Sequence, residues 1–307
     1  MASYTISLFG KLQVRRGDRC VELEAAKVQE LLCYLMLFRG RPHPRECIAS
    51  ILWDDQTTAR SKQYLRKALW QLQAALGEEH VSESKRLFAV SPEWVEVNTH
   101  ASLRLDVCEF ERTCLATRGM PGQSLTQDAA NQLANAVDLY QGDLLDGWYQ
   151  EWCLIERERL QHLLLCAFDK LMAYHEHRGA FEESVAYGQQ ILRFDHAREH
   201  THCALMRIYA AAGDRARALR QFERCVQALR DELDVPPAEV TVCLHEQIRA
   251  GHYPPVSALP ALGRAVQPPP PSPLMDVAQH LHSLRTALAQ LAAQVDQEIA
   301  AIETLLL

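Results

Sequence analysis

Four basic side chains lie close together in the sequence and could bind an anionic partner. Residues 56–77 carry four positive charges and no negative charge, whereas the whole chain has a formal net charge of −7. The same stretch has apolar side chains at the spacing of a helix face, at Leu65, Leu69, Leu72 and Leu76. We therefore predict an amphipathic helix with its leucines turned inward and its basic side chains turned outward. A solvated face that merely lacks acids is the alternative.

Nucleic acid is the anionic partner that such a face suits best. Arg and Lys pair with phosphates or with guanine edges, and Gln can read adenine. The side chains that we predict to contact DNA are Arg60, Lys62, Gln63, Arg66, Lys67 and Trp70, with Lys85 and Arg86 at the start of a later hairpin. The sequence does not assign any of them to a particular base.

The elements around the basic helix favour a winged helix-turn-helix within residues 1–100. The pattern predicts short strands within 4–23, helices at 25–38, 45–53 and 56–77, and a hairpin of strands 87–90 and 94–97. In that architecture the second helix of the turn motif enters the major groove. Residues 1–100 carry 14 Lys and Arg against 12 Asp and Glu. Since this excess is small, we expect specific affinity to need more than one copy on the DNA.

A repeat of 34 residues follows in the next part of the chain. Gly179 and Gly213 are one period apart, and so are the small residues Ser184 and Ala218. A glycine in the turn with a small residue five positions later is typical of tetratricopeptide helix pairs. The predicted helices are 107–118, 126–140, 150–178, 181–194, 198–212, 215–233 and 238–250. We therefore predict an all-α domain over residues 101–252.

The C-terminal residues divide into a spacer and a heptad repeat. Residues 253–273 include the run Pro268–Pro271 and lack hydrophobic periodicity, which predicts an extended linker. In residues 274–307 the predicted oligomerisation seam comprises Leu281, Leu284, Leu288, Leu291, Val295, Ile302 and Leu305. We expect a coiled coil between copies of the chain. A helix folded back onto the chain's own helical domain is the alternative.

Four stretches together resemble the SARP type of transcriptional regulator. They are residues 64–77, 105–110, 140–152 and 205–237, and the resemblance extends over about residues 1–252. It implies an OmpR-like winged helix joined to a bacterial transcriptional activator domain of tetratricopeptide-like helices. Two departures stand out, because the family usually has Gly where this chain has Asp234, and its wing often ends in Gly-Tyr where this chain has residues 88–94. Base contacts therefore cannot be transferred from the family.

The resemblance also implies a second contact surface. In the family, the loop before the recognition helix can touch RNA polymerase, and here that loop comprises Asp54, Asp55, Gln56 and Thr57. A polar loop in which Thr57 or Thr58 caps the helix is the alternative.

Motifs of other protein classes are absent from the sequence. There is no glycine-rich phosphate loop and no nucleophile elbow, so we do not expect an enzyme or a cofactor. His196 and His200 could share a helix face, but His202 points elsewhere and the stretch lies at a connection between repeat helices, so we predict surface histidines and no metal site. The ten cysteines are scattered, without a Cys-x-x-Cys pair, and we predict small buried apolar residues. With no apolar run of membrane-spanning length, we expect a cytoplasmic protein without a membrane partner.

These observations favour a mainly α protein that regulates transcription. We predict a sequence-specific regulator, an activator, that binds double-stranded promoter DNA through its winged helix and associates with itself. RNA polymerase is the further partner that the resemblance implies. The alternative is a tetratricopeptide scaffold or ligand-responsive interaction protein whose winged helix makes protein contacts.

Overall fold

A small sheet opens the N-terminal part of the chain. The computed structural model describes residues 4–54, 56–77, 86–98 and 100–252. Strands β1 (Tyr4–Ser7), β2 (Gln13–Arg16) and β3 (Arg19–Cys20) are antiparallel neighbours, and β7 (Leu103–Leu105) pairs in parallel with β1. The sheet order is β3-β2-β1-β7, with Ile6 opposite both Val14 and Leu105. The sheet thus takes one strand from beyond residue 100.

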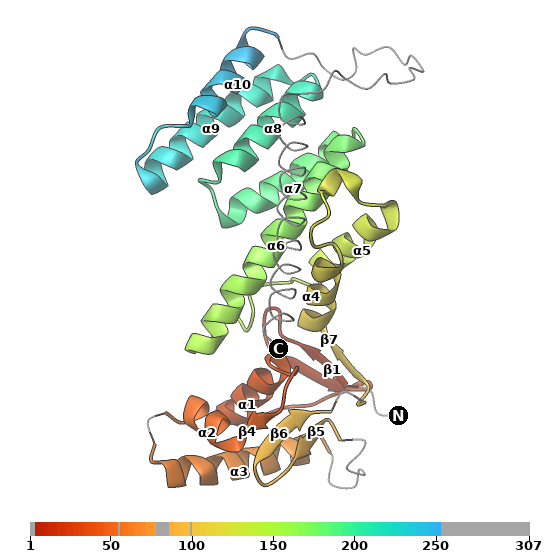
Figure 1. The fold of residues 1–307 in the computed structure, drawn as a ribbon, viewed down its shortest axis with the longest axis vertical. Coiled ribbons are helices and arrows are strands. Elements are labelled where there is room, and N and C mark those ends of the chain that lie inside the picture. Colours follow the sequence, from red (N-terminus) through yellow and green to blue (C-terminus); the bar gives the residue numbers. More distant parts are fainter. Residues whose placement is uncertain (1–3, 55, 78–85, 99, 253–307) are drawn as a thin grey trace, which may run out of the picture. The chain divides into compact units, whose positions relative to one another are not determined.

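Three helices and a second sheet complete the winged helix-turn-helix (Figure 1). The helices are α1 (Ala26–Leu37), α2 (Arg45–Leu52) and α3 (Thr58–Ala75). The second sheet is antiparallel, in the order β4-β6-β5, with β4 at His43–Pro44, β5 at Phe88–Val90 and β6 at Trp94–Val97. The order of elements agrees with the prediction, and β4 is an addition that sequence patterns did not indicate.

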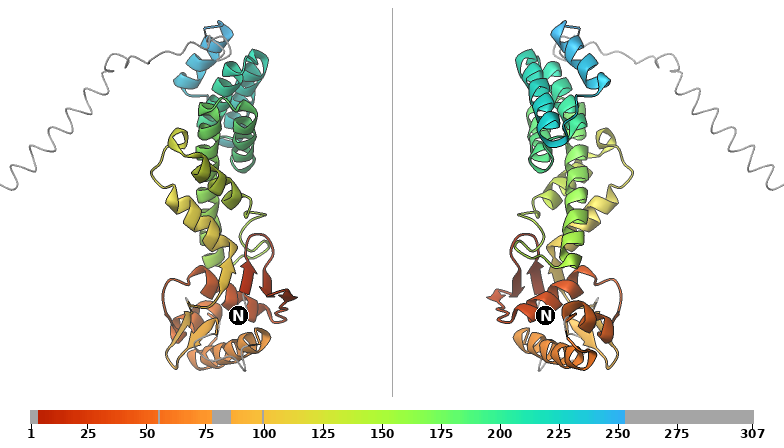
Figure 2. Two further views of the ribbon diagram at one scale, coloured as in Figure 1. Left: turned by 90° about the vertical axis from the view of Figure 1, so that its right-hand side faces the viewer. Right: turned by 90° about the vertical axis from the view of Figure 1, so that its left-hand side faces the viewer.

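Helices make up the rest of the described chain. Their bounds are α4 (Asp106–Ala116), the 3₁₀ turn η2 (Gly122–Ser124), α5 (Gln127–Val137), α6 (Glu151–His177), α7 (Phe181–Phe194), α8 (Glu199–Ala211), α9 (Arg215–Leu233) and α10 (Glu239–Arg249). Helices α6 to α10 pack in succession, each against the next (Figure 2). The predicted mainly α fold class is confirmed, but strand β7 lies within residues 101–252, which we predicted to be all-α.

The 34-residue repeat has a clear structural basis. Gly179 and Gly213 have positive φ angles of 72° and 81° and end α6 and α8. Both turns make the same two backbone hydrogen bonds. The glycine N–H donates to the carbonyl oxygen three residues earlier, and the N–H of the next residue donates to the carbonyl oxygen five residues before it. Ser184 and Ala218 are fully buried, so the small side chains let neighbouring helices approach closely.

The loop before α6 attaches the helical domain to the first sheet. Phe9 and Leu144 form an antiparallel bridge, and the backbone N–H of Leu145 donates to Leu8 O at 2.9 Å. The Arg157 guanidinium of α6 donates to three carbonyl oxygens of the same loop, those of Leu144, Leu145 and Trp148. The family-like stretch 140–152 therefore has a structural role, since it carries the contact between the two parts.

A second attachment lies at the start of α4. The Asp106 carboxylate accepts hydrogen bonds from the backbone N–H groups of Leu8 and Phe9, at 2.8 and 3.1 Å, and from its neighbour Val107. The predicted linker 253–273 and the coiled coil 274–307 lie outside the described residues.

Candidate nucleic-acid interface

Helix α3 is divided into an apolar face and a polar face. Leu65, Leu69, Leu72 and the helix-ending Leu76 are all buried, as the sequence predicted. Ser61 is buried as well, and its hydroxyl donates to Trp53 O and to Thr57 O, both at 3.1 Å. These contacts fix the start of α3 against the turn that precedes it.

The predicted DNA-contacting side chains of α3 lie together on the exposed face. All six are exposed: Arg60, Lys62, Gln63, Arg66, Lys67 and Trp70. Their spacing of three or four residues places them in the first three turns of one helix face, which we call the basic face. Trp70 is 65% exposed, although burial is the usual state of so large an apolar ring. Within the described residues, Arg60, Arg66 and Lys67 have no carboxylate partner.

An acid from the preceding helix reaches the edge of this face. Lys62 Nζ lies 2.5 Å from Glu46 Oε1 of α2. The hydrogen bond and the charge of Lys62 hold the pKa of Glu46 below its usual value. The sequence showed that α3 itself lacks acids, but it did not reveal this neighbour.

Arg45 is a further basic residue at the interface that sequence reasoning missed. Its guanidinium donates to Ser91 O at 3.0 Å, and its backbone N–H donates to Glu93 O at 2.8 Å. Partial burial lowers the pKa of Arg45, and the positive charge of Arg66 lowers it further. Arg45 therefore joins the first turn of α2 to the hairpin and adds a cation beside Arg66. No sequence pattern singled it out, because only folding brings residues 45, 66 and 91 together.

The β5–β6 hairpin, which we call the wing, is less basic than the helix. Arg86 is the one basic residue among residues 86–98 and is half-buried, and the predicted contact Lys85 lies outside the described residues. Glu93 and Glu96 are exposed on the hairpin beside Val90 and Trp94. Among the described residues of this part, the positive charge is therefore concentrated on α3 and Arg45, because the described wing carries more negative than positive charge.

The turn between α2 and α3 holds the residues predicted to contact polymerase. Asp54 and Thr57 are exposed, Gln56 is half-buried, and Asp55 lies outside the described residues. Thr57 occupies the N-cap position of α3, but its side chain makes no capping hydrogen bond. The side chain of Thr57 therefore remains accessible to a partner.

Two predictions about cysteine and histidine burial need correction. Cys33 and Cys225 are buried as predicted, but Cys20, Cys47 and Cys243 are exposed. His202 is not a surface residue, because its ring is buried and hydrogen bonded to His196 O and to Gln221. Among the described residues, no group of three or more His, Cys, Asp or Glu side chains could hold a metal ion. No described helix is long and apolar enough to span a membrane.

Comparisons with known proteins agree with this architecture. Residues 105–249 match the model of the bacterial transcriptional activator domain. The fold is similar to that of Mycobacterium tuberculosis EmbR in complex with a low-affinity phosphopeptide, with a TM-score of 0.62 and 18% sequence identity. That match covers 82% of this chain and 66% of the EmbR chain, so just under two thirds of EmbR has a counterpart here. No curated protein matches the chain significantly.

Proposed function

We propose that this chain is a transcriptional regulator of the SARP type, as its activator domain and its fold support, and that it binds double-stranded promoter DNA through the basic face of α3. The observation that carries this proposal is the division of α3 into two faces. Its leucines are buried, whereas Arg60, Arg66 and Lys67 are exposed without carboxylate partners among the described residues. A recognition helix needs this arrangement, because its N-terminal turns must reach into the major groove.

The side chains on the basic face suit different parts of DNA. Gln63, Arg66 and Trp70 lie near the middle of the face, where base edges and thymine methyl groups would be. Arg60 and Lys67 lie along one edge, and Lys62 lies along the other, where it is paired with Glu46 of α2. Edge cations suit phosphates, which give affinity without sequence preference.

A mobility-shift titration tests the proposal. The DNA would be the fragment upstream of the chain's own gene, at 50 and 200 mM salt, with the Arg66→Ala/Lys67→Ala double variant beside the wild type. The Arg220→Ala/Arg224→Ala variant is the matched control, because it removes two exposed arginines from α9 and gives the same net charge. We expect a specific shift that weakens steeply with salt, is lost in the α3 variant and is retained in the α9 control.

Two results would contradict binding of DNA through the basic face of α3. Equal weakening in both double variants would mean that only overall charge matters. A shift that survives both the α3 substitutions and the higher salt would move the interaction away from α3, toward the scaffold alternative.

We further propose that the chain activates transcription and that the turn before α3 contacts RNA polymerase. Asp54 and Thr57 are exposed there, beside the recognition helix but off its basic face. An Asp54→Ala/Thr57→Ala variant should keep wild-type DNA affinity and lose transcript in a reconstituted transcription assay. Unchanged transcript would reject the polymerase contact and leave DNA binding intact.

A further inference from the structure

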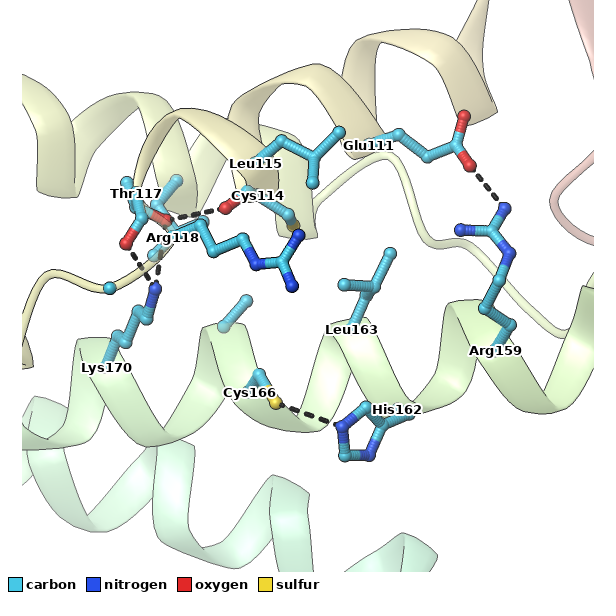
Figure 3. Close-up of a pocket in the computed structure, with 13 residues that line it drawn as sticks. Glu111, Cys114, Leu115, Thr117, Arg118, Arg159, His162, Leu163, Cys166 and Lys170 are labelled. Carbon is cyan, nitrogen blue, oxygen red and sulfur yellow. Dashed lines mark hydrogen bonds and ion pairs between the residues drawn. The ribbon is translucent and has the colours of Figure 1, made fainter. Parts of the chain in front are cut away.

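A cleft in the helical domain lies between α4 and α6. Its volume is about 570 Å³, which is within the range of small-molecule sites. Its walls are mainly apolar, and they include Leu115 of α4, Leu133 of α5 and Leu163 of α6. Figure 3 shows the side chains of α4 and α6 facing one another across this space.

The buried thiol of Cys114 belongs to the apolar wall. Burial raises its pKa to about 12, so the thiol is neutral at physiological pH. Leu115, by contrast, is 54% exposed at the mouth of the cleft. Such an exposed leucine beside a concave apolar surface is what a ligand's hydrocarbon part would cover.

Cations line the same cleft, and two of them lack an acidic partner. The guanidinium of Arg118 makes no hydrogen bond or ion pair with any described residue, and it lies in the gap between α4 and α6 (Figure 3). Lys170 donates to the backbone oxygen and the hydroxyl of Thr117, which are uncharged. The third cation, Arg159, is paired with Glu111 and Glu156. The cleft therefore holds an excess of positive charge above an apolar floor.

We propose that this cleft binds an amphipathic organic anion, a carboxylate with an apolar chain. The apolar chain lies against Leu115, Leu133 and Leu163, and the carboxylate pairs with Arg118. A guanidinium suits this role, because it can donate two parallel hydrogen bonds to a carboxylate. A neutral molecule of the same shape leaves Arg118 without a partner, so charge as well as shape determines the choice of ligand.

Glu111 connects the cleft to the winged helix-turn-helix. Its carboxylate is paired with Arg159 at the cleft and, at 3.1 Å, with Arg39 in the segment after α1. The carboxylate that pairs with Arg118 brings a negative charge into the cleft that Arg159 also lines. It therefore competes with Glu111 for the charge of Arg159 and so changes the charge that Arg39 meets. Occupancy of the cleft is thereby linked to the contact between the two parts.

Calorimetric titration of the full-length protein with decanoate tests the site, with decanol as the neutral probe of similar shape. We expect one decanoate per chain, with a dissociation constant on the order of 100 μM or tighter. Decanol should bind at least about fivefold more weakly, since it cannot pair with the guanidinium.

Variants separate the two parts of the site. Arg118→Gln should weaken decanoate binding at least about fivefold and leave decanol unchanged, and Arg118→Lys should restore part of the loss. Leu115→Gln should weaken both probes. Arg112→Gln is the matched control, because Arg112 is an exposed arginine of α4, the helix that ends just before Arg118, and does not line the cleft. All three positions are exposed, so the four variants should fold.

Equal affinity for decanoate and decanol, unchanged affinity in Arg118→Gln, or no saturable binding of decanoate would each overturn the proposal. The same follows if Arg112→Gln weakens binding as much as Arg118→Gln does.

The link through Glu111 rests on the proposed DNA-binding function, because its readout is DNA affinity. Saturating decanoate should change the DNA affinity of the wild type at least about threefold and have no effect in Glu111→Gln. If decanoate binds in calorimetry but DNA affinity stays constant, the link is rejected and the site stands. If no DNA binds at all, the proposed function fails, and the calorimetric result still decides the site.

Discussion

Lys62 of α3 and Glu46 of α2 form an ion pair, with 2.5 Å between Nζ and Oε1. The pair lies at the edge of the basic face, so one of its cations is neutralised in the free protein. A carboxylate at this edge would also face the DNA backbone. In the proposed mode of DNA binding, Glu46 would therefore act against phosphate binding, in the manner of residues that limit non-specific affinity.

Removing this carboxylate should strengthen DNA binding. Glu46→Gln frees the Lys62 ammonium and removes a negative charge, so we expect about threefold to tenfold tighter binding at low salt and a smaller gain at high salt. Fluorescence anisotropy with labelled duplexes of the operator and of random sequence would measure it, and the gain should appear on both. Glu182→Gln is the control, since it makes the same charge change on exposed α7. An equal gain in that control would show that only net charge matters.

The backbone conformation of Asp234 explains why SARP-type sequences usually have glycine at this position. The residue ends α9 in the left-handed conformation, with φ 54° and ψ 39°. Glycine adopts that conformation without steric cost, which accounts for the glycine that SARP-type sequences usually have here. Aspartate is one of the few other residues that tolerate it, because its short polar side chain can bond locally.

The effect of replacing Asp234 on the free energy of unfolding should therefore depend on the shape of the new side chain. Asp234→Gly should leave the free energy of unfolding within about 0.5 kcal/mol of the wild type, since relief of strain offsets the greater freedom of the unfolded chain. Asp234→Val should lower it by roughly 1–2 kcal/mol, because a β-branched residue is strained at positive φ. Urea unfolding monitored by circular dichroism would decide this. A valine variant as stable as the glycine variant would contradict the explanation.

Local patterns predicted the elements well where each element carries its own signal. The spacing of Leu65, Leu69 and Leu72 defined the inward face of α3, and Gly179 and Gly213 marked the turns of the repeat. These features depend on residues within one or two helical turns, so sequence alone exposes them.

Features that depend on distant residues were missed for a physical reason. Strand β7 pairs with β1 across about a hundred residues, and a three-residue strand has too little pattern to show its partner. The approach of Glu46 to Lys62 and of Arg45 to Ser91 depends on how helices and hairpin pack. His202 was predicted to be a surface residue because its stretch lies at a connection between repeat helices, yet Gln221 of the next helix forms a hydrogen bond with its ring.

The heptad pattern of the C-terminal residues leads to a prediction about self-association. Leu288 and Leu291 occupy the predicted seam of residues 274–307. A Leu288→Asp/Leu291→Asp variant should reduce the protein to a monomer, because charged side chains at seam positions oppose helix pairing. Light scattering coupled to size-exclusion chromatography would measure the mass. Alanines placed at Gln290 and Gln294, which lie outside the predicted seam, should leave the oligomer intact. A wild-type protein that is already monomeric would support the folded-back alternative.

Arg157 supports the loop that joins the two parts of the chain. Its Nη2 lies 2.8 Å from Leu144 O and 3.0 Å from both Leu145 O and Trp148 O. Lysine keeps the charge but cannot reproduce the planar fork, so Arg157→Lys should lower the free energy of unfolding by roughly 1–3 kcal/mol. The exposed Arg193→Lys on α7 should have little effect. Denaturant titration of both variants would test this, and equal stability of the two would exclude a special role for the fork.

His202 should make the helical domain less stable in mild acid. Its Nε2 lies 2.9 Å from His196 O and its Nδ1 lies 2.7 Å from Gln221 Nε2, an arrangement that suits a neutral ring donating through Nε2 and accepting at Nδ1. Burial lowers the pKa of His202 in the folded chain, whereas the unfolded chain binds a proton near pH 6.5. As pH falls below about 6.5, the unfolded state gains a proton that the folded state resists, so the free energy of unfolding decreases. The loss can reach about 1.4 kcal/mol per pH unit and ends once the folded-state pKa is passed.

Comparison with a non-titrating side chain isolates the contribution of His202. Between pH 7.5 and 5.5 the wild type should lose about 1 kcal/mol more unfolding free energy than His202→Gln, because glutamine does not take up a proton. This comparison between the wild type and His202→Gln is needed because burial also lowers the pKa values of His175 and His245. Those two residues contribute equally to both proteins, so their effect cancels. His200→Gln, at an exposed position of the same helix, should keep the wild-type dependence. Urea unfolding at the two pH values gives all three numbers, and parallel losses in the three proteins would assign the acid sensitivity to other groups.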